Sequence, residues 1–285
     1  MNKTVIACLA VIAFFGDASH ADPRGIGSCE ATATGSQTDL EALKVSLANR
    51  WSGGRPREWG VSVSGVATRL CTFENDLALV FHACGGSYDA AIIDLLERER
   101  IPATIFISGP WLKAHPDIAL RLTANPLFEI ANHGLRHRPL SVTGRSAYGI
   151  QGARNVEEVV DEVEGGARAI QAVTGRRPDL FCPGTAYADE VAIEVVKALG
   201  YVPVSFTVNG DAGATSSQAQ IVDSLNNAPR GSLVLLHMNR PEGWTAEALA
   251  TALPTLKDRG VRFVKLSRCS FFLSGAAVRP SSRHK

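Results

Sequence analysis

Residues 128–141 read "FEIANHGLRHRPLS", and this stretch decides the fold. It opens with a short, mostly apolar run, which is typical of a buried β-strand. His133 follows this run at once, and His137 stands four positions later. Two imidazoles at this spacing can share one metal ion. The stretch therefore predicts a buried strand that leads directly into a metal-binding loop.

Segments that predict strands and segments that predict helices alternate on both sides of this stretch. Strands are expected near residues 77–81, 103–108, 180–184, 201–208, 232–237 and 262–266. Helices are expected over 38–53, 89–100, 111–124, 156–175, 189–200 and 244–260, with caps at Asp39, Asp89, Gly175 and Asp189. Repeated β–α units with apolar strands indicate a parallel sheet covered by helices. The sequence predicts an α/β fold, a distorted (β/α) barrel of about seven parallel strands.

Ligand-type side chains stand at or directly after the ends of the expected strands. In folds of this class the chemistry lies where the parallel strands end and the loops begin. Buried strands explain the apolar runs, but they do not explain so many polar residues at strand ends. We therefore expect these side chains to converge on one site. They are His82, Cys84, His133, Cys182, Asp211 and His237.

The N-terminus has the pattern of a secretory signal peptide. Lys3 precedes an apolar run over residues 4–16, and small residues before position 22 place cleavage after Ala21. The run is shorter than the roughly 20 residues that span a bilayer, so no stable membrane span is expected. The protein is predicted to be exported, to the periplasm or the medium. The expected organisation is a signal peptide over 1–21, an N-terminal extension over 22–75, a main domain over 76–270 and a tail over 271–285.

Composition excludes some partners and leaves others open. The net charge is +1 and the isoelectric point about 7.7, which gives no reason to expect nucleic acid or an anionic membrane as a partner. The sequence does not indicate an oligomeric state. Export makes disulfides possible, and loss of the signal peptide leaves five of the six cysteines. A disulfide between Cys29 and Cys71 is expected, because both precede the main domain.

Over roughly residues 77–268 the chain resembles the polysaccharide deacetylases, the NodB-homology domain of carbohydrate esterase family four. The segment "IPATIFISGPWLKAHPDIALRL" (101–122) and the stretch 128–141 carry the resemblance most specifically. His133 and His137 match the family's His-x-x-x-His motif, and "LVLLH" (233–237) matches its late histidine motif. The resemblance implies a NodB-like barrel and hydrolysis of the N-acetyl amide of a glycan, such as a chitin-like oligomer or peptidoglycan.

The resemblance also implies roles for individual residues. His133 and His137 would hold one divalent metal, with Zn²⁺ favoured and other divalent ions possible. His237 would protonate the leaving amine, and Asp211 would be the family's late aspartate, although Ala212 follows it where the family usually has Trp. Substrate contacts are expected near Pro183, Gly184 and Tyr187.

Two family motifs are altered in this chain. The family opens with Thr-Phe-Asp-Asp, a base and then a metal ligand, whereas "VFHA" (80–83) puts His82 and Ala83 there. The Arg that tethers the base is replaced by Cys182. His82 could turn to the metal as a third ligand, or it could remain the base with Asp211 as its orienting partner. A third possibility is loss of activity, and the sequence does not decide among the three.

Three other interpretations use the same residues. A glycan-binding module that no longer turns its ligand over would explain Ala83 and Cys182. A closed Cys₂His₂ structural zinc site would combine the two cysteines with the histidine pair, but these residues come from separate loops. A redox role for Cys84 and Cys182 lacks the Cys-x-x-Cys spacing that such proteins use.

Overall fold

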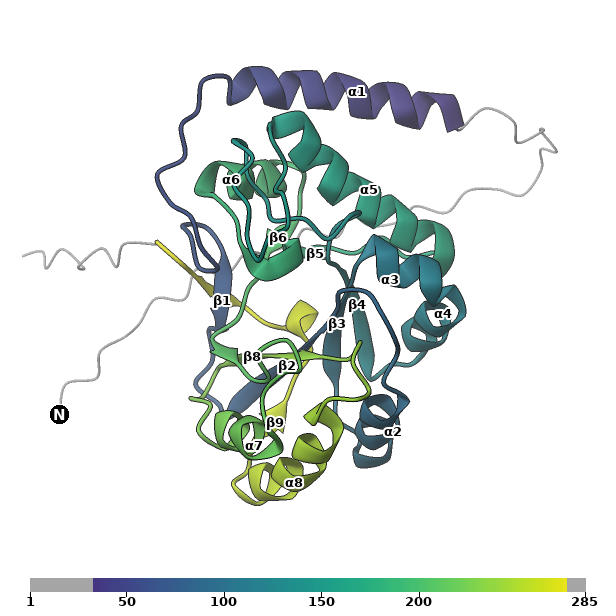
Figure 1. The fold of residues 1–285 in the computed structure, drawn as a ribbon, viewed down its shortest axis with the longest axis vertical. Coiled ribbons are helices and arrows are strands. Elements are labelled where there is room, and N and C mark those ends of the chain that lie inside the picture. Colours follow the sequence, from purple (N-terminus) through teal and green to yellow (C-terminus); the bar gives the residue numbers. More distant parts are fainter. Residues whose placement is uncertain (1–32, 276–285) are drawn as a thin grey trace, which may run out of the picture.

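The computed structural model describes residues 33–275, and a parallel sheet forms the centre of the molecule (Figure 1). Its strands run in the order β6-β5-β4-β3-β2-β8-β7, and β9 pairs with the start of β2. Every pairing in this sheet is parallel, which confirms the predicted α/β class. The strand bounds are β2 (Asp76–Ala83), β3 (Ala103–Ile107), β4 (Phe128–Asn132), β5 (Leu180–Phe181), β6 (Val202–Pro203), β7 (Val208–Asn209), β8 (Leu233–His237) and β9 (Arg262–Phe263).

Strand β2 lies at the middle of the sheet and is buried along its whole length. Such a strand is flanked by neighbours in the sheet and covered on both faces, so its sequence reads as a nearly continuous apolar run. Its register aligns His82 with Phe106 of β3 on one side and with His237 of β8 on the other. Two histidines from distant parts of the chain therefore lie side by side at the carboxyl end of the sheet.

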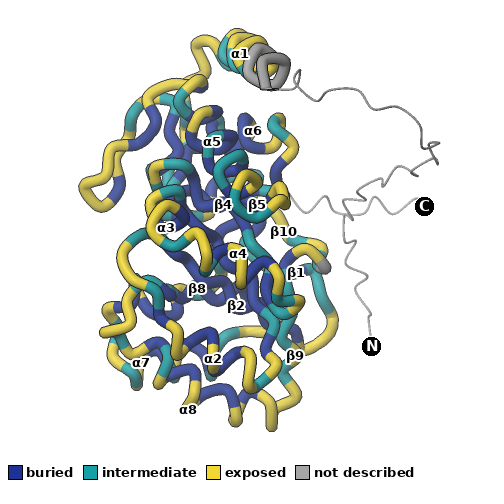
Figure 2. Tube along the Cα trace, turned by 90° about the vertical axis from the view of Figure 1, so that its right-hand side faces the viewer, coloured by how far each residue is buried: buried dark blue, intermediate teal, exposed yellow. Residues whose placement is uncertain are grey.

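Helices cover the sheet, and its central strands β2, β3 and β8 are almost entirely buried, whereas β7 and β9 are partly exposed (Figure 2). The Asp89 side chain caps α2 by accepting from the backbone of Ala91 and Ile92, and Asp189 caps α6. Gly175 ends α5 with φ of +72°, as expected. The helix bounds are α1 (Ala33–Arg50), α2 (Ala90–Glu99), α3 (Gly109–Ala114), α4 (Pro116–Ala124), α5 (Val156–Thr174), α6 (Glu190–Ala198), α7 (Gln218–Asn226) and α8 (Thr245–Asp258), with short 3₁₀ turns η1 (Gly184–Ala186) and η2 (Leu266–Arg268).

Two expected elements are each divided into two in the structure. The helix expected over 111–124 breaks into α3 and α4, because Pro116 cannot donate the backbone hydrogen bond that would continue α3. The strand expected over 201–208 becomes β6 and β7, which lie at opposite edges of the sheet. The chain between them passes β1 (Ala67–Leu70), where Ser205 donates to the Ala67 carbonyl at 2.9 Å. No pairing joins β6 to β7 within residues 33–275, so the sheet is an open, curled half-barrel.

The flanking segments pack onto this sheet and onto each other. Helix α1 begins before Asp39, so the prediction of an N-cap at this residue was wrong, and it packs on α5 with a Lys44–Asp161 ion pair at 2.6 Å. Strand β1 pairs antiparallel with β10 (Phe271–Leu273), which joins the expected extension to the start of the expected tail.

Some predictions fall partly or wholly outside the described range. The signal peptide, the cleavage point and Cys29 lie outside the described residues, as do positions 276–285. Cys71 is disulfide-bonded, whereas Cys84, Cys182 and Cys269 are free. The Cys29–Cys71 pairing stays a prediction. Between residues 33 and 275, no helix has the length and apolar character needed to cross a bilayer.

Candidate metal centre and active site

The polar residues at the strand ends form one cluster. The His82 ring lies 4.1 Å from the His133 ring and 5.7 Å from the His237 ring, between ring centroids. The His133 and His137 rings are 4.8 Å apart. Strands β2, β4 and β8 all end at the same edge of the sheet, so their last residues converge as the sequence predicts.

His133 is fixed in one orientation by its backbone neighbours. It is fully buried, and its Nδ1 donates to the Cys182 carbonyl at 2.9 Å. This bond assigns the proton to Nδ1 and leaves Nε2 with a free lone pair. Nε2 lies 3.6 Å from the sulfur of Cys84. A histidine whose second nitrogen is tied to a carbonyl is the usual form of a metal ligand.

His137 sits on a loop that the fold holds under constraint. Its φ of +59° is in the left-handed region, which is uncommon for a residue with a side chain. The buried carboxylate of Glu162 accepts from the backbone N–H groups of Arg136 at 2.9 Å and Arg138 at 3.1 Å, on either side of His137. Its own Nε2 is buried and has no hydrogen-bond partner among the described residues. Buried polar atoms are nearly always paired, so this nitrogen calls for a ligand.

His237 is held by Asp211, whose two carboxylate oxygens both accept hydrogen bonds. Asp211 is fully buried, and its Oδ1 accepts from His237 Nδ1 at 2.8 Å. Its Oδ2 accepts from the His237 backbone N–H at 2.6 Å and from the Thr245 hydroxyl at 3.1 Å. The Gly213 N–H donates to Oδ1 at 3.1 Å. Asp211 therefore orients His237, and no described contact joins it to His82.

The charges in the cluster follow from burial and from these neighbours. Burial, and then the nearby His133, hold the pKa of His82 well below its usual value. Burial also disfavours a charged His237, but Asp211 and Cys84 outweigh it and raise the pKa of His237 to about 10. Burial opposes ionisation of Cys84, yet the surrounding imidazoles, His133 first, bring the pKa of this thiol well below its usual value.

The donors of the cluster fit a soft divalent metal ion. In each of three groups the donor atoms lie within 4.8 Å of one another, and the groups contain only imidazole nitrogens and thiol sulfurs. No Asp or Glu joins any of these groups between residues 33 and 275. Nitrogen and sulfur donors suit Zn²⁺ rather than Mg²⁺ or Ca²⁺. The groups are His82–Cys84–His237, His82–His133–Cys182 and Cys84–His133–His137.

The expected substrate-contact residues lie on the neighbouring loop. A side chain at Gly184 would place its Cβ 2.2 Å from the His137 carbonyl carbon, so the two loops touch through their backbones. Pro183 precedes the turn η1 that begins at Gly184. The Tyr187 ring packs against Trp59 at 5.7 Å and against the exposed Tyr148 at 5.6 Å. An aromatic surface thus adjoins the loop that carries His137.

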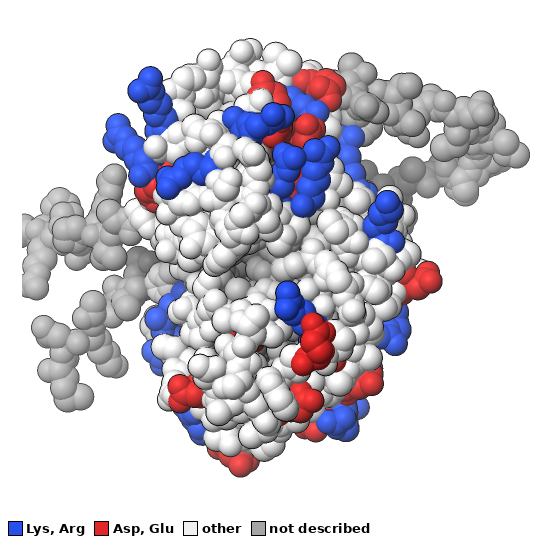
Figure 3. Space-filling model, viewed as in Figure 1, with Lys and Arg blue, Asp and Glu red and all other residues white. Residues whose placement is uncertain are grey.

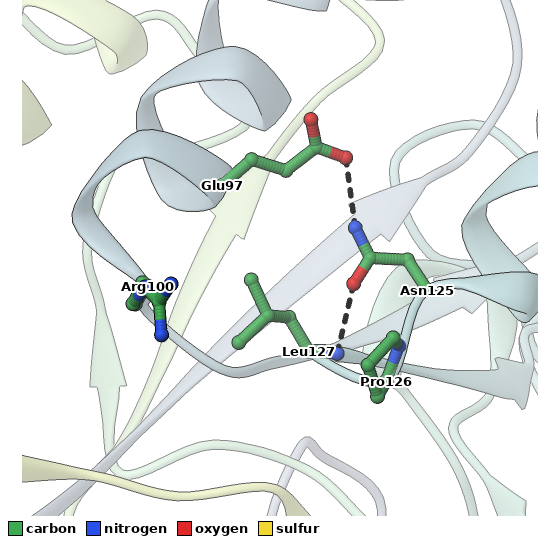
Figure 4. A pocket seen from close by; sticks show the side chains of 5 residues that line it. All are labelled: Glu97, Arg100, Asn125, Pro126 and Leu127. Atoms are coloured by element: carbon green, nitrogen blue, oxygen red, sulfur yellow. Dashed lines mark hydrogen bonds between the residues drawn. The ribbon is translucent and has the colours of Figure 1, made fainter.

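The surface has hollows in more than one place. The middle of the face in Figure 3 is hollowed and carries few charged side chains, while Lys and Arg, with some Asp and Glu, gather above it. A separate hollow, shown in Figure 4, is lined by Glu97, Arg100, Asn125, Pro126 and Leu127. Its residues come from the segments that precede β3 and β4, so it lies at the amino end of the strands. This hollow is remote from the histidine cluster.

Sequence reasoning placed one residue at this site without settling its role and missed another. Cys84 was expected among the converging side chains because it follows a strand, and its sulfur faces His133 and His137. Glu162 was not singled out, because nothing in a helical run of acidic residues shows which of them turns inward to support a loop.

Comparison with known proteins identifies the domain. The family model described as "Polysaccharide deacetylase" matches residues 70–204. This segment is therefore similar to the polysaccharide deacetylases. A chitooligosaccharide deacetylase of Sinorhizobium fredii is 29% identical over 181 residues, which cover 59% of this chain and 79% of that protein. The peptidoglycan-N-acetylmuramic acid deacetylase PdaA of Bacillus subtilis is 23% identical over 209 residues, covering 70% of this chain and 73% of that protein.

Solved structures of polysaccharide deacetylases share the fold. The structure of Bacillus subtilis PdaA superposes with a TM-score of 0.58 at 22% identity, covering 80% of this chain and 88% of that one. A CE4 family pseudoenzyme from Bacillus anthracis superposes with a TM-score of 0.61 at 20% identity, covering 71% and 67%. These matches confirm the NodB-like fold. The named sequence relatives are deacetylases, which hydrolyse carbon–nitrogen bonds outside peptides.

Proposed function

We propose that the protein is an exported, metal-dependent deacetylase that hydrolyses the N-acetyl amide of an amino-sugar glycan. The observation that carries this proposal is that the histidine pair and the His237–Asp211 pair lie close together at one edge of the sheet. His137 has a buried nitrogen without a hydrogen-bond partner among residues 33–275, and the Nε2 of His133 faces the sulfur of Cys84. His237, which Asp211 holds in place, lies on the other side of His82. Relatives named for chitooligosaccharide and peptidoglycan support a chitin-like oligomer or peptidoglycan as substrate.

The metal would be held by His133 and His137, and the nitrogen-rich surroundings favour Zn²⁺. A bound Zn²⁺ lowers the pKa of water and polarises a carbonyl, which is what hydrolysis of an amide at neutral pH requires. The orphaned Nε2 of His137 and the oriented Nε2 of His133 supply the reason to place the ion here.

The remaining groups of the cluster would move protons. His82 lies between the histidine pair and His237. We therefore assign it the role of the base that accepts a proton from the attacking water. His237 would donate a proton to the nitrogen of the departing sugar, and Asp211 keeps its ring in place for that step. Acetate and a free amino sugar result. Asp211 is a positioning residue here, because its oxygens are already occupied.

The surroundings of the site suit a neutral sugar chain. The net charge of +1 agrees with a neutral glycan better than with nucleic acid. The rings of Tyr187, Trp59 and Tyr148 give flat apolar surfaces on which the C–H faces of sugar rings can pack. Gly184 brings this surface close to His137. Export rests on the signal-peptide pattern and fits a substrate outside the cell.

A second candidate function is glycan binding without turnover. Ala83 is fully buried and offers no ligand at the end of β2. Cys182 is also buried, and burial raises the pKa of its thiol well above the usual value, so it cannot tether a base by charge. Proteins that share this fold include one described as a pseudoenzyme, so the fold does not itself imply activity.

An acetate-release assay separates the two functions. Purified protein supplied with Zn²⁺ should release acetate from chitin oligomers or from peptidoglycan fragments. The matched variant His82→Asp with Ala83→Asp rebuilds the sequence that the family uses, and a thermal melt confirms that it folds. If the wild type binds glycan but releases no acetate, and only the rebuilt variant is active, the protein is a binding module.

A further inference from the structure

We infer that the Cys84 thiolate is the third protein ligand of the metal held by His133 and His137. This inference deepens the proposed function, because it concerns the same metal centre. It makes the site a His₂Cys site, in place of the three-histidine or Cys₂His₂ arrangements that the sequence also allows. The ligand atoms of the three residues lie within 4.8 Å of one another.

The separation of the donor atoms matches a shared zinc ion. With Zn–N bonds of about 2.0–2.1 Å and Zn–S bonds of about 2.3 Å, tetrahedral geometry places nitrogen and sulfur roughly 3.6 Å apart. The distance between Cys84 Sγ and His133 Nε2 is 3.6 Å. The second observation is independent of this distance. His137 belongs to the same group, and its Nε2 is buried without a partner among the described residues.

The competing groups explain these observations less well. Neither of the other two groups contains His137, so both would leave its buried nitrogen unpaired. His82 does not share a group with His137, which argues against a three-histidine site. Cys182 is fully buried, and its thiol points to the Pro183 carbonyl at 3.7 Å. Cys84 is half-buried, so a metal on its sulfur can still be reached by substrate.

The fold holds Cys84 in this place. Its carbonyl accepts from the Ser108 hydroxyl at 2.7 Å, which ties the residue after β2 to the end of β3. The loop then turns at Gly86, where φ is +79° and a Cβ would lie 3.3 Å from the Asn239 carbonyl oxygen. The thiol side chain is thereby kept over the loop that follows β4 rather than over solvent.

A thiolate ligand has consequences for the metal. Binding replaces the S–H bond with a sulfur–metal bond and releases the thiol proton, so metal uptake should release protons. Sulfur is a soft donor and selects Zn²⁺ or Co²⁺ over Mg²⁺ and Mn²⁺. Three protein ligands leave the fourth position of a tetrahedral ion open, as catalytic zinc sites require.

Cobalt substitution tests the sulfur ligand directly. The full chain is stripped with a chelator and loaded with Co²⁺, and its near-ultraviolet absorption is recorded. A thiolate-to-cobalt charge-transfer band is expected in the wild type. Cys84→Asp should retain the metal through oxygen but lose the band. Cys84→Ala should lose both the band and most of the bound metal, with circular dichroism confirming that each variant folds.

Two cysteine variants serve as controls. Cys269→Ser changes a thiol that lies near Lys265, outside the cluster, and should leave the band unchanged. Cys182→Ala should also keep the band, since its sulfur is not a ligand. Retention of the band in both Cys84 variants, or its loss in Cys182→Ala, would overturn the inference in favour of the group that contains His82, His133 and Cys182.

The result of the cobalt test can be told apart from the result of the acetate-release assay. A Cys84-dependent band in a protein that releases no acetate would support the ligand and refute the deacetylase. Acetate release by a protein whose cobalt form shows no such band would refute the ligand and leave the deacetylase standing.

Discussion

The two ends of strand β2 differ in how completely their polar groups are satisfied. At the amino end, Asp76 accepts from Arg262 at 2.6 and 3.0 Å and from the Thr72 hydroxyl at 2.7 Å. At the carboxyl end, His82 and Cys84 stand among imidazoles, and His137 keeps a buried nitrogen without a partner in the described part of the chain. One end of a single strand is therefore fully paired, while the other is not.

This difference separates stability from function. Paired charges at the amino end hold β2 against β9 and contribute to the folded state. The unpaired nitrogen of His137 at the carboxyl end is unfavourable in an empty site, and the proposed metal would satisfy it. The hollow in Figure 4 lies at the paired end, where Asn125 donates to Glu97 at 2.8 Å. A hollow alone therefore does not mark the histidine cluster.

The largest effect is expected from removing a proposed metal ligand at the carboxyl end of the sheet. His133→Ala should abolish metal binding and with it nearly all acetate release, since two protein ligands remain where catalytic zinc sites use three. Metal analysis of purified protein measures this, with about one ion per chain expected in the wild type. Unchanged metal content in this variant would show that the histidine pair is not the metal site.

A smaller effect is expected on the other side of the same cluster. His237→Ala should lower kcat by about 10²–10⁴ while the metal stays bound, because a proton donor is lost and a ligand is not. Asp211→Asn is the matched variant, which should reduce kcat less. Steady-state kinetics and metal content are measured together. If His237→Ala also lost its metal, the ring would be a ligand.

The backbone contact between the loop of Gly184 and the loop of His137 gives a further test at the carboxyl end of the sheet. Gly184→Ala would push a Cβ to within 2.2 Å of the His137 carbonyl carbon, so the loop that carries His137 must move. We expect metal affinity to fall by about 10–100-fold, as for other residues that orient a ligand. Gly60→Ala is the control, because nothing lies within 4 Å of a Cβ there. Equal affinities in the two variants would show that the contact does not position His137.

The smallest effect concerns the paired end. The Arg262 guanidinium beside Asp76 holds the pKa of this carboxyl below its usual value. Its contribution to stability is therefore present above the unfolded-state pKa of about 3.9 and is lost as the pH falls through the lower folded-state pKa.

Asp76→Asn should lower the free energy of unfolding by about 1 kcal/mol at neutral pH. The free energy of unfolding should also fall less steeply with decreasing pH in this variant than in the wild type. Denaturant unfolding across acid pH measures both, and metal content should not change. A loss of metal in this variant would show that the amino end of β2 also affects the metal site, and not stability alone.

The sequence predicted the convergence of this site better than the contacts within it. His82, His133 and His237 could be placed together because each ends a parallel strand, and the ends of parallel strands share an edge. The partner of Asp211 could not be deduced, because the loop after β7 decides whether its carboxylate meets His82 or His237. The structure gives it to His237.

Cys84 shows the same limit more clearly. Its sulfur meets a histidine that is 49 positions away in sequence, and the meeting depends on the turn at Gly86 and the Ser108 hydrogen bond. Periodicity carries no information about such a turn. The break between α3 and α4 was readable at Pro116, whereas the division of residues 201–208 into two edge strands depends on their tertiary contact with β1.

The most direct test of the account is acetate release measured as a function of zinc bound per chain. Chelator-stripped protein is titrated with Zn²⁺ and assayed on a chitin oligomer and on peptidoglycan fragments, with His133→Ala as the control. We expect no acetate release from stripped protein, a linear rise up to about one zinc per chain, and no rise in the variant. Full zinc occupancy without acetate release from either substrate would contradict it.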